Sequence, residues 1–313
     1  DRLFGSFATA RLIDIDQAAI DRACEALVSA DAVPATKLRA VIAPMSAVLR
    51  HAARRGWCAP PLLERPKPSP GRTDWLAPAE AQRLILAAAP HLAPLLIFLL
   101  CTGARVGEAL ALQWTDVDLA AGTVSFRDTK SGYDRRGVHL PPKAIVALAN
   151  LAHRDGAVFR RPGPWRRAPD GTRVQRPGPA YGQFKTGWAG ASRRAGLIVW
   201  EAASEIRTDA DGPYTPVAWR PRLTPHGTRH SWASWYYAAT KDPMKLMREG
   251  GWRSLDLVER YAHLMPSHLV PAIAEIWGVT DPAQFPAAVA ARGGADQGQP
   301  ARAPANRRAR STP

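Results

Sequence analysis

Apolar residues recur three or four positions apart over long stretches of the chain. Residues 16–30 and 35–55 both show this spacing, which predicts two amphipathic helices, the second ending at Gly56. The most apolar run, residues 92–101, is about half as long as the roughly 20 residues that a membrane-spanning helix needs. We therefore expect this run to form a buried core helix.

Polar and apolar residues alternate at two neighbouring places. Residues 123–128 and 138–140 alternate, and the turn-forming residues 131–137 lie between them, which predicts a β-hairpin. Helical patterns dominate again after it, except in residues 160–179, whose six arginines and five prolines are typical of a loop. The expected fold class is mainly α with a small antiparallel β-sheet or hairpin (α+β).

Proline clustering divides the chain into two domains. Five prolines between residues 60 and 70 favour an extended connector, so we place a linker at residues 60–74. Residues 1–59 then form a small helical domain, whose length allows only a thin core, and residues 75–285 form the main domain. Residues 286–313 consist largely of Ala, Gly, Pro and Arg and predict a disordered tail.

The net charge restricts the class of partner. Forty-two Lys and Arg against 27 Asp and Glu give +15, of which the tail contributes +4. This excess favours a polyanion, nucleic acid ahead of an anionic membrane surface. Three scattered cysteines fit neither a disulfide framework nor a Cys-rich zinc site and indicate a reducing cytosol. The N-terminus, which lacks Met and a signal-peptide pattern, suggests processing or a fragment.

One short motif combines a helix start with basic chemistry. Thr224 and Pro225 suit the N-cap and first position of a helix, which places His226 and Arg229 on one face. A helix N-terminus attracts anions, so this end could hold a phosphate. An ordinary capping turn with a surface arginine has the same pattern, and the motif alone does not separate the two.

Four blocks in order resemble the tyrosine recombinases of the phage-integrase type. They are TGARVGEALALQWTDVD at 102–118, Lys130 in its hairpin, LTPHGTRHSWAS at 223–234, and GGWRS followed by ERYAH within 250–263. The resemblance covers nearly all of residues 75–278, and the preceding helical segment resembles the family's core-binding domain. It implies a catalytic domain that cleaves and rejoins DNA through a 3′-phosphotyrosyl intermediate, which needs neither cofactor nor metal.

The resemblance also implies roles for single residues. Tyr261 would be the nucleophile, and His226 would accept its proton. Arg105 and Arg229 would bind the scissile phosphate, since planar guanidinium groups suit its oxygens. Lys130 would protonate the departing 5′-oxygen.

Two further positions support these roles. Trp252 stands where many members carry a second histidine; its indole can donate a hydrogen bond to the phosphate but cannot titrate. Glu108 matches a supporting carboxylate that orients the catalytic groups. His230 and His263 flank motif positions, and we interpret both as structural.

The implied partner is double-stranded DNA, bound by a homo-tetramer on paired sites with a dimer on each site, and assisted in some members by DNA-bending proteins. We expect a cytoplasmic, nucleoid-associated protein without a membrane segment. Two alternatives share the fold: a catalytically silent DNA-binding member, and a topoisomerase of the tyrosine type. Residues 160–179 fit a solvated loop or a contact with the DNA backbone, and residues 198–222 have no assigned role.

Overall fold

The computed structural model describes residues 2–30, 32–66, 74–127, 135–202, 207–209, 212–214, 217–259, 261 and 267–280. The chain divides into two compact units, residues 1–72 and 73–313, and each is described by itself. Lys130, His263 and the predicted tail at residues 286–313 lie outside the described residues.

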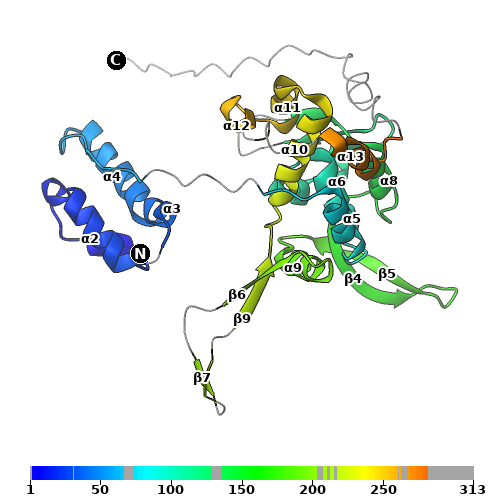
Figure 1. Ribbon diagram of the computed structural model, residues 1–313, viewed down its shortest axis with the longest axis horizontal. Helices are drawn as coiled ribbons and strands as arrows, with labels where there is room; N and C mark the ends of the chain where they lie inside the picture. Colours follow the sequence, from blue (N-terminus) through cyan, green and yellow to red (C-terminus); the bar gives the residue numbers. More distant parts are fainter. Residues whose placement is uncertain are drawn as a thin grey trace, which may run out of the picture. The chain divides into compact units, whose positions relative to one another are not determined.

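The first unit is helical (Figure 1). Its elements are α1 (Arg2–Ser6), a 3-10 turn (Leu12–Asp14), α2 (Gln17–Leu27), α3 (Pro34–Lys37), a π-helical turn (Leu38–Ile42) and α4 (Ala43–Arg54). The two helices expected from apolar spacing are confirmed. The second contains the π turn because Pro44 has no amide hydrogen for the ordinary helical ladder, and the amide of Ala43 reaches back to the carbonyl of Leu38.

A small core holds the first unit together. Ile20, Val41 and Met45 are almost fully buried, and they pack with the half-buried side chains of Phe7 and Leu38. The side chain of Asp16 caps α2 by accepting a hydrogen bond from the amide of Ala19 at 2.8 Å.

The second unit is built around α6 (Ala93–Thr102), the predicted core helix, in which Leu95, Phe98 and Leu99 are fully buried. α6 packs against four other helices, α5, α7, α8 and α10 (Figure 1). The other helices are α5 (Pro78–Leu86), α7 (Val106–Ala111), α8 (Pro142–Ala149), α9 (Lys185–Arg194), α10 (Gly227–Thr240), α11 (Pro243–Gly250), α12 (Asp256–Glu259) and α13 (Val270–Trp277), with 3-10 turns at Trp114–Asp116 and Ser267–Leu269. In the described part of the chain, no helix is both long and apolar enough to cross a bilayer.

Small antiparallel sheets complete the second unit, and the α+β class is confirmed. The predicted hairpin is part of a three-stranded sheet of β1 (Val117–Asp118), β2 (Thr123–Phe126) and β3 (Arg135–His139), in that order. β3 begins within the stretch expected to form the turn. Three further pairs follow: β4 (Arg160–Arg167) with β5 (Arg173–Ala180), β6 (Ile198–Ala202) with β9 (Val217–Pro221), and β7 (Arg207–Asp209) with β8 (Gly212–Tyr214).

The prediction of a loop at residues 160–179 was wrong, because these residues form the β4–β5 hairpin (Figure 1). A two-stranded ribbon consists only of edge strands, so a proline can stand where no ladder hydrogen bond is required. Pro162 lies opposite Pro177, and the register shifts on both sides of Pro162. Gly163 and Gly178 lie next to this proline pair. An added Cβ on either glycine would come within 2.6 Å of a backbone oxygen of the other strand. Glycine and proline at these places are thus compatible with pairing.

Candidate active site

Arg229 lies at the centre of the candidate site and is 3% exposed. Its two terminal nitrogens donate hydrogen bonds at 2.5 Å to the carbonyl oxygens of Gly103 and Gly250. These carbonyls belong to the ends of α6 and α11, where helix dipoles concentrate partial negative charge. The guanidinium carbon also lies 4.4 Å from the centre of the Trp252 ring. Arg229 therefore joins the ends of two helices to the first turn of α10.

Both glycines that hold Arg229 are covered by tryptophan rings. A Cβ on Gly103 would lie 2.1 Å from the ring of Trp232, and one on Gly250 would lie 1.8 Å from the ring of Trp252. Gly103 also has a φ of 60°, in the left-handed region that ends α6. Only glycine lets each tryptophan ring lie directly over the residue whose carbonyl binds Arg229.

Arg105 precedes the first residue of α7 and is fixed by Glu108. Its backbone amide donates to one carboxylate oxygen at 2.9 Å, and its Nη1 pairs with the other at 2.5 Å. The Arg105 side chain is 26% exposed, while that of Glu108 is 6% exposed. A cavity of about 600 Å³ opens beside this pair and is also lined by Asp116 and Arg127, which form an ion pair at 2.7 Å. Glu108 thus orients an arginine that remains accessible.

His226 is the residue before α10, and its environment keeps it neutral. Burial lowers the pKa of the imidazole below its usual 6.5, and the positive charges of Arg229 and Arg105 lower it further. A neutral imidazole retains one nitrogen that can accept a proton or a hydrogen bond at pH 7. His226 and the two arginines therefore act electrostatically on one another.

Tyr261 contacts a histidine that we did not expect to take part. The hydroxyl of Tyr261 lies 2.7 Å from Nδ1 of His230, and Tyr261 is 3% exposed. The ring of His226 stands edge-on to that of His230 with the centroids 5.0 Å apart, and the Trp252 ring lies 5.6 Å from that of Tyr261. His230 follows His226 by four residues and so shares its helix face, which is the signal that could have identified it.

The structure thus brings most of the predicted residues together in two adjoining groups. His226 and Arg229 join Arg105 and its carboxylate partner around one positive centre, and Trp252 lies between Arg229 and Tyr261. Within the described residues, no cluster of three or more His, Cys, Asp or Glu side chains could hold a metal ion.

Comparison with known proteins shows which proteins the chain is similar to. The family model described as phage integrase family matches residues 194–268. The integrase of Salmonella phage P22 is 30% identical over 235 residues, which cover 73% of this chain and 54% of that protein. Residues 194–268 match the phage integrase family, and the chain is similar to its phage P22 member. It spans about half the length of the phage P22 relative.

Solved structures of family members share the fold. A lambda integrase dimer bound to a COC′ core site has a TM-score of 0.56 at 13% identity, covering 83% of this chain and 86% of that one. The Tn1549 transposon integrase in complex with circular intermediate DNA has a TM-score of 0.52 at 13% identity, covering 87% and 90%. At such identities the likeness concerns the fold alone.

Proposed function

We propose that the chain is a site-specific DNA recombinase of the integrase type, which cleaves and rejoins strands through a 3′-phosphotyrosyl intermediate. The observation that carries the proposal is the Tyr261 hydroxyl held by His230 beside the group formed by Arg229, Trp252 and His226. A phenol, a neutral imidazole and a buried arginine are the groups that phosphoryl transfer to tyrosine requires.

The positive centre is suited to the scissile phosphate. Arg105 and Arg229 would bind the non-bridging oxygens, and their charge would offset the negative charge that gathers there in the transition state. Trp252, stacked on Arg229, would add one N–H donor. Loss of one donor of this type typically lowers the rate by about 10²- to 10³-fold.

Proton transfer from Tyr261 needs a base, since a phenol with a pKa near 10 is only about 0.1% ionised at neutral pH. Sequence resemblance assigns this role to His226, whereas the described contact favours His230. With its proton on Nε2, His230 accepts a hydrogen bond from the hydroxyl at Nδ1. His226, which lies within the field of both arginines, would then face the phosphate.

The chemical balance assigns one role to each group. The Tyr261 oxygen attacks phosphorus, its proton passes to His230, and the bond to the 5′-oxygen breaks. That oxygen leaves as a hydroxyl with a proton from Lys130, a role that rests on the resemblance alone. Because the Tyr261 side chain is buried, we propose that this residue becomes exposed when DNA engages.

The proposal extends to assembly and location. Residues 1–59 would bind DNA as a core-binding domain, residues 75–285 would catalyse, and residues 60–74 would connect them. The active form would be a homo-tetramer on paired duplex sites with a dimer on each, aided in some cases by DNA-bending proteins, in a cytoplasmic, nucleoid-associated setting. The lambda integrase dimer on its core site is consistent with this arrangement.

The decisive experiment is to sequence the DNA ends trapped on Tyr261 in cells and then test a nicked duplex carrying that site. A covalent adduct is expected on denaturing gels with the wild-type chain and none with Tyr261→Phe. Binding without an adduct would indicate a catalytically silent member. Relaxation of supercoiled DNA without sequence preference would indicate a topoisomerase. An adduct that persists in Tyr261→Phe would show that the nucleophile is a different residue.

A further inference from the structure

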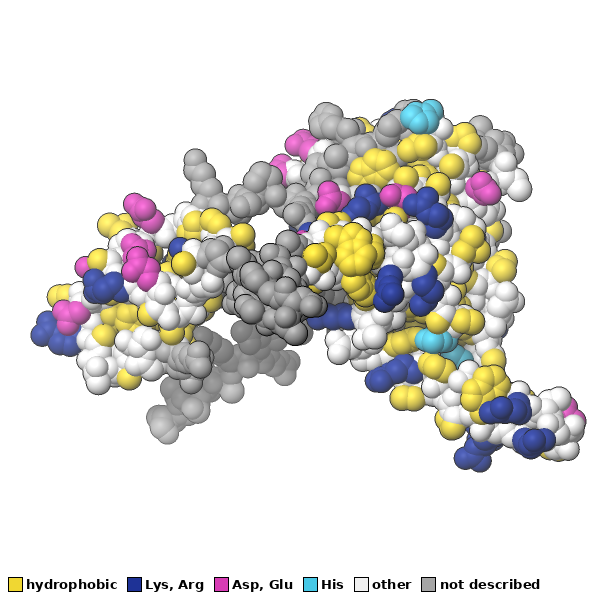
Figure 2. All heavy atoms as spheres, turned by 60° about the horizontal axis from the view of Figure 1, so that its bottom comes forward, with side chains coloured by type: hydrophobic (Ala, Val, Ile, Leu, Met, Phe, Trp, Pro, Cys, Tyr) yellow, Lys and Arg dark blue, Asp and Glu magenta, His cyan; other side chains and the backbone are white. Residues whose placement is uncertain are grey.

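The β4–β5 hairpin carries a concentration of positive charge outside the candidate active site. Figure 1 shows the hairpin projecting from the helices of the second unit, and Figure 2 shows Lys and Arg side chains on that projecting arm. We propose that this hairpin is a second contact surface for duplex DNA, separate from the cleaved phosphate. The identification of DNA as the partner rests on the proposed function. The existence of a binding surface on the hairpin rests on the observations that follow.

The charge of the hairpin is strongly one-sided. Residues 160–180 contain six arginines and one acidic residue, Asp170, which lies in the turn. The arginines are Arg160, Arg161, Arg166, Arg167, Arg173 and Arg176. All but Arg160 are exposed, and these five form no ion pair with any part of the chain that the structure describes. An exposed surface of this kind favours a polyanion.

Two of these arginines repel each other in the folded chain. Arg167 lies directly opposite Arg173 across the ribbon, and like charges in directly opposed positions destabilise a β-ladder. The guanidinium of Arg173 lies 5.4 Å from the centre of the Trp165 ring, which is 55% exposed. A bound phosphate would relieve the repulsion, and the exposed indole next to it offers apolar contact area for a sugar or base.

Strand alternation distributes the arginines over both faces of the ribbon. The register pairs Trp165 with Gln175 and Arg167 with Arg173 on one face, and it places Arg166 on the opposite face. Arg176, an even number of residues from the partner of Arg166, shares that second face. A two-stranded ribbon fits the major groove, where phosphates flank it on both sides. Charge on both faces matches that geometry better than it matches a flat membrane surface.

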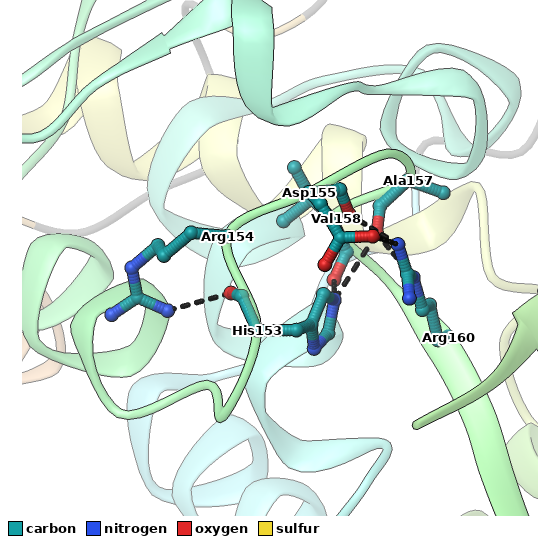
Figure 3. A network of polar contacts seen from close by, with 6 residues as sticks. All are labelled: His153, Arg154, Asp155, Ala157, Val158 and Arg160. Atoms are coloured by element: carbon teal, nitrogen blue, oxygen red, sulfur yellow. Dashed lines mark hydrogen bonds and ion pairs between the residues drawn. The ribbon is translucent and has the colours of Figure 1, made fainter. Parts of the chain in front are cut away.

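The base of the hairpin is fixed by a polar network (Figure 3). Arg160 pairs with Asp155 at 2.9 Å and donates to the carbonyl of Ala157 at 3.0 Å. Nε2 of His153 lies 3.1 Å from the carbonyl oxygens of both Ala157 and Val158, and since carbonyls only accept, Nε2 carries the hydrogen. Arg160 therefore serves as an anchor, unlike the five exposed arginines.

This anchored segment is attached to the chain that follows α7. The amide of Trp114 donates to the carbonyl of Gly156 at 2.9 Å, and the amide of Val158 donates to the carbonyl of Leu112 at 3.0 Å. α7 begins directly after Arg105 and ends at Ala111. Duplex DNA bound by the hairpin would therefore lie at a defined distance from the phosphate that Arg105 is proposed to bind.

The test measures the salt dependence of DNA binding. The full chain and the variant Arg166→Ala/Arg167→Ala/Arg173→Ala/Arg176→Ala are titrated with a 40-base-pair duplex at several salt concentrations, using fluorescence anisotropy. If each arginine contacts one phosphate, the slope of log affinity against log salt falls by about 3 to 4 in magnitude. The matched variant with four lysines should keep most of the slope, and Asp170→Asn should bind more tightly than the wild type.

The outcomes separate this proposal from the proposed function. Thermal unfolding checks that the four-alanine variant is folded, and its stability should not fall because a repulsive pair is removed. An unchanged salt slope in a folded variant would overturn the hairpin proposal, even if the wild-type chain forms the covalent adduct. A reduced slope without any wild-type adduct would sustain the DNA contact and reject recombinase activity. If the four-alanine variant loses binding to phosphatidylglycerol vesicles while its DNA binding equals that of the wild type, the hairpin would instead be a membrane-binding surface.

Discussion

The hydroxyl of Tyr261 lies 2.7 Å from Nδ1 of His230, a residue 31 positions earlier in the chain. His230 is one helical turn beyond His226, whose ring stands edge-on to it. The contact links the proposed nucleophile to the helix face that also carries His226, in the motif proposed to bind the phosphate. It divides the roles of the two histidines, one on the hydroxyl and one beside the arginines.

Replacing His230 by Ala is expected to slow adduct formation by about 10²- to 10⁴-fold, the usual contribution of a general base. The physical reason is that the variant removes the proposed acceptor of the Tyr261 proton. Single-turnover cleavage of a nicked duplex measures the rate, and Tyr261→Phe gives the background. DNA affinity, measured in parallel, should change little. A normal rate in His230→Ala combined with a large loss in His226→Ala would return the base to His226.

Stability should depend on pH through His226. Burial, Arg229 and Arg105 lower the pKa of His226 in the folded chain, while in the unfolded chain it stays near 6.5. Below about pH 6.5 the unfolded chain therefore binds the proton first, and stability is lost as pH falls until the lower folded-state pKa is passed. Above that range the contribution is constant.

The measurement is urea unfolding of the wild type and of His226→Gln at pH 7.5 and 5.5. The wild type should lose more stability between the two pH values than the variant, which cannot titrate at this position. Equal losses would mean that the pKa of His226 is not lowered in the folded chain.

Thiol reactivity should rank the three cysteines by burial. Burial raises the pKa of Cys101 to about 12, and burial with the nearby charge of Asp21 raises that of Cys24. Cys58 is only half-buried. Because the thiolate is the reactive form, iodoacetamide at pH 8 should modify Cys58 first and Cys101 last. Mass spectrometry gives the order, and in urea all three should react at similar rates.

Local periodicity was enough to place much of the helical framework. The apolar run at 92–101 became α6, because a helix that is apolar on all sides has to lie in a core. The arginine- and proline-rich stretch at 160–179 was wrongly expected to be a loop, since composition does not show that proline is tolerated where a ribbon has two edges.

The candidate site, like the fold, could be predicted from the sequence only in part. Arg105, His226, Arg229 and Tyr261 stand in ordered motifs, so resemblance could assign them roles. The spacing from His226 could have placed His230 on the same helix face, but not its contact with Tyr261, because that contact depends on how the chain brings two distant segments together. The carbonyls of Gly103 and Gly250 leave no side-chain signal in a sequence, although they hold Arg229.

Gly103→Ala should therefore damage both the fold and the site. The added methyl group would meet the Trp232 ring at 2.1 Å on a backbone with φ of 60°. Left-handed strain of about 1–2 kcal/mol and overpacking of about 1–3 kcal/mol should together lower the free energy of unfolding by at least ~2 kcal/mol.

A matched control is available in the same unit. Gly196 also has a positive φ, 70°, but no atom lies within 4 Å of an added Cβ, so Gly196→Ala should cost only the backbone strain. Urea unfolding compares the two variants. Because the Gly103 carbonyl holds Arg229, Gly103→Ala should also reduce adduct formation at temperatures where it stays folded, whereas Gly196→Ala should not. Equal destabilisation by both variants would mean that the Trp232 ring yields without cost, and the proposed constraint on Arg229 would be absent.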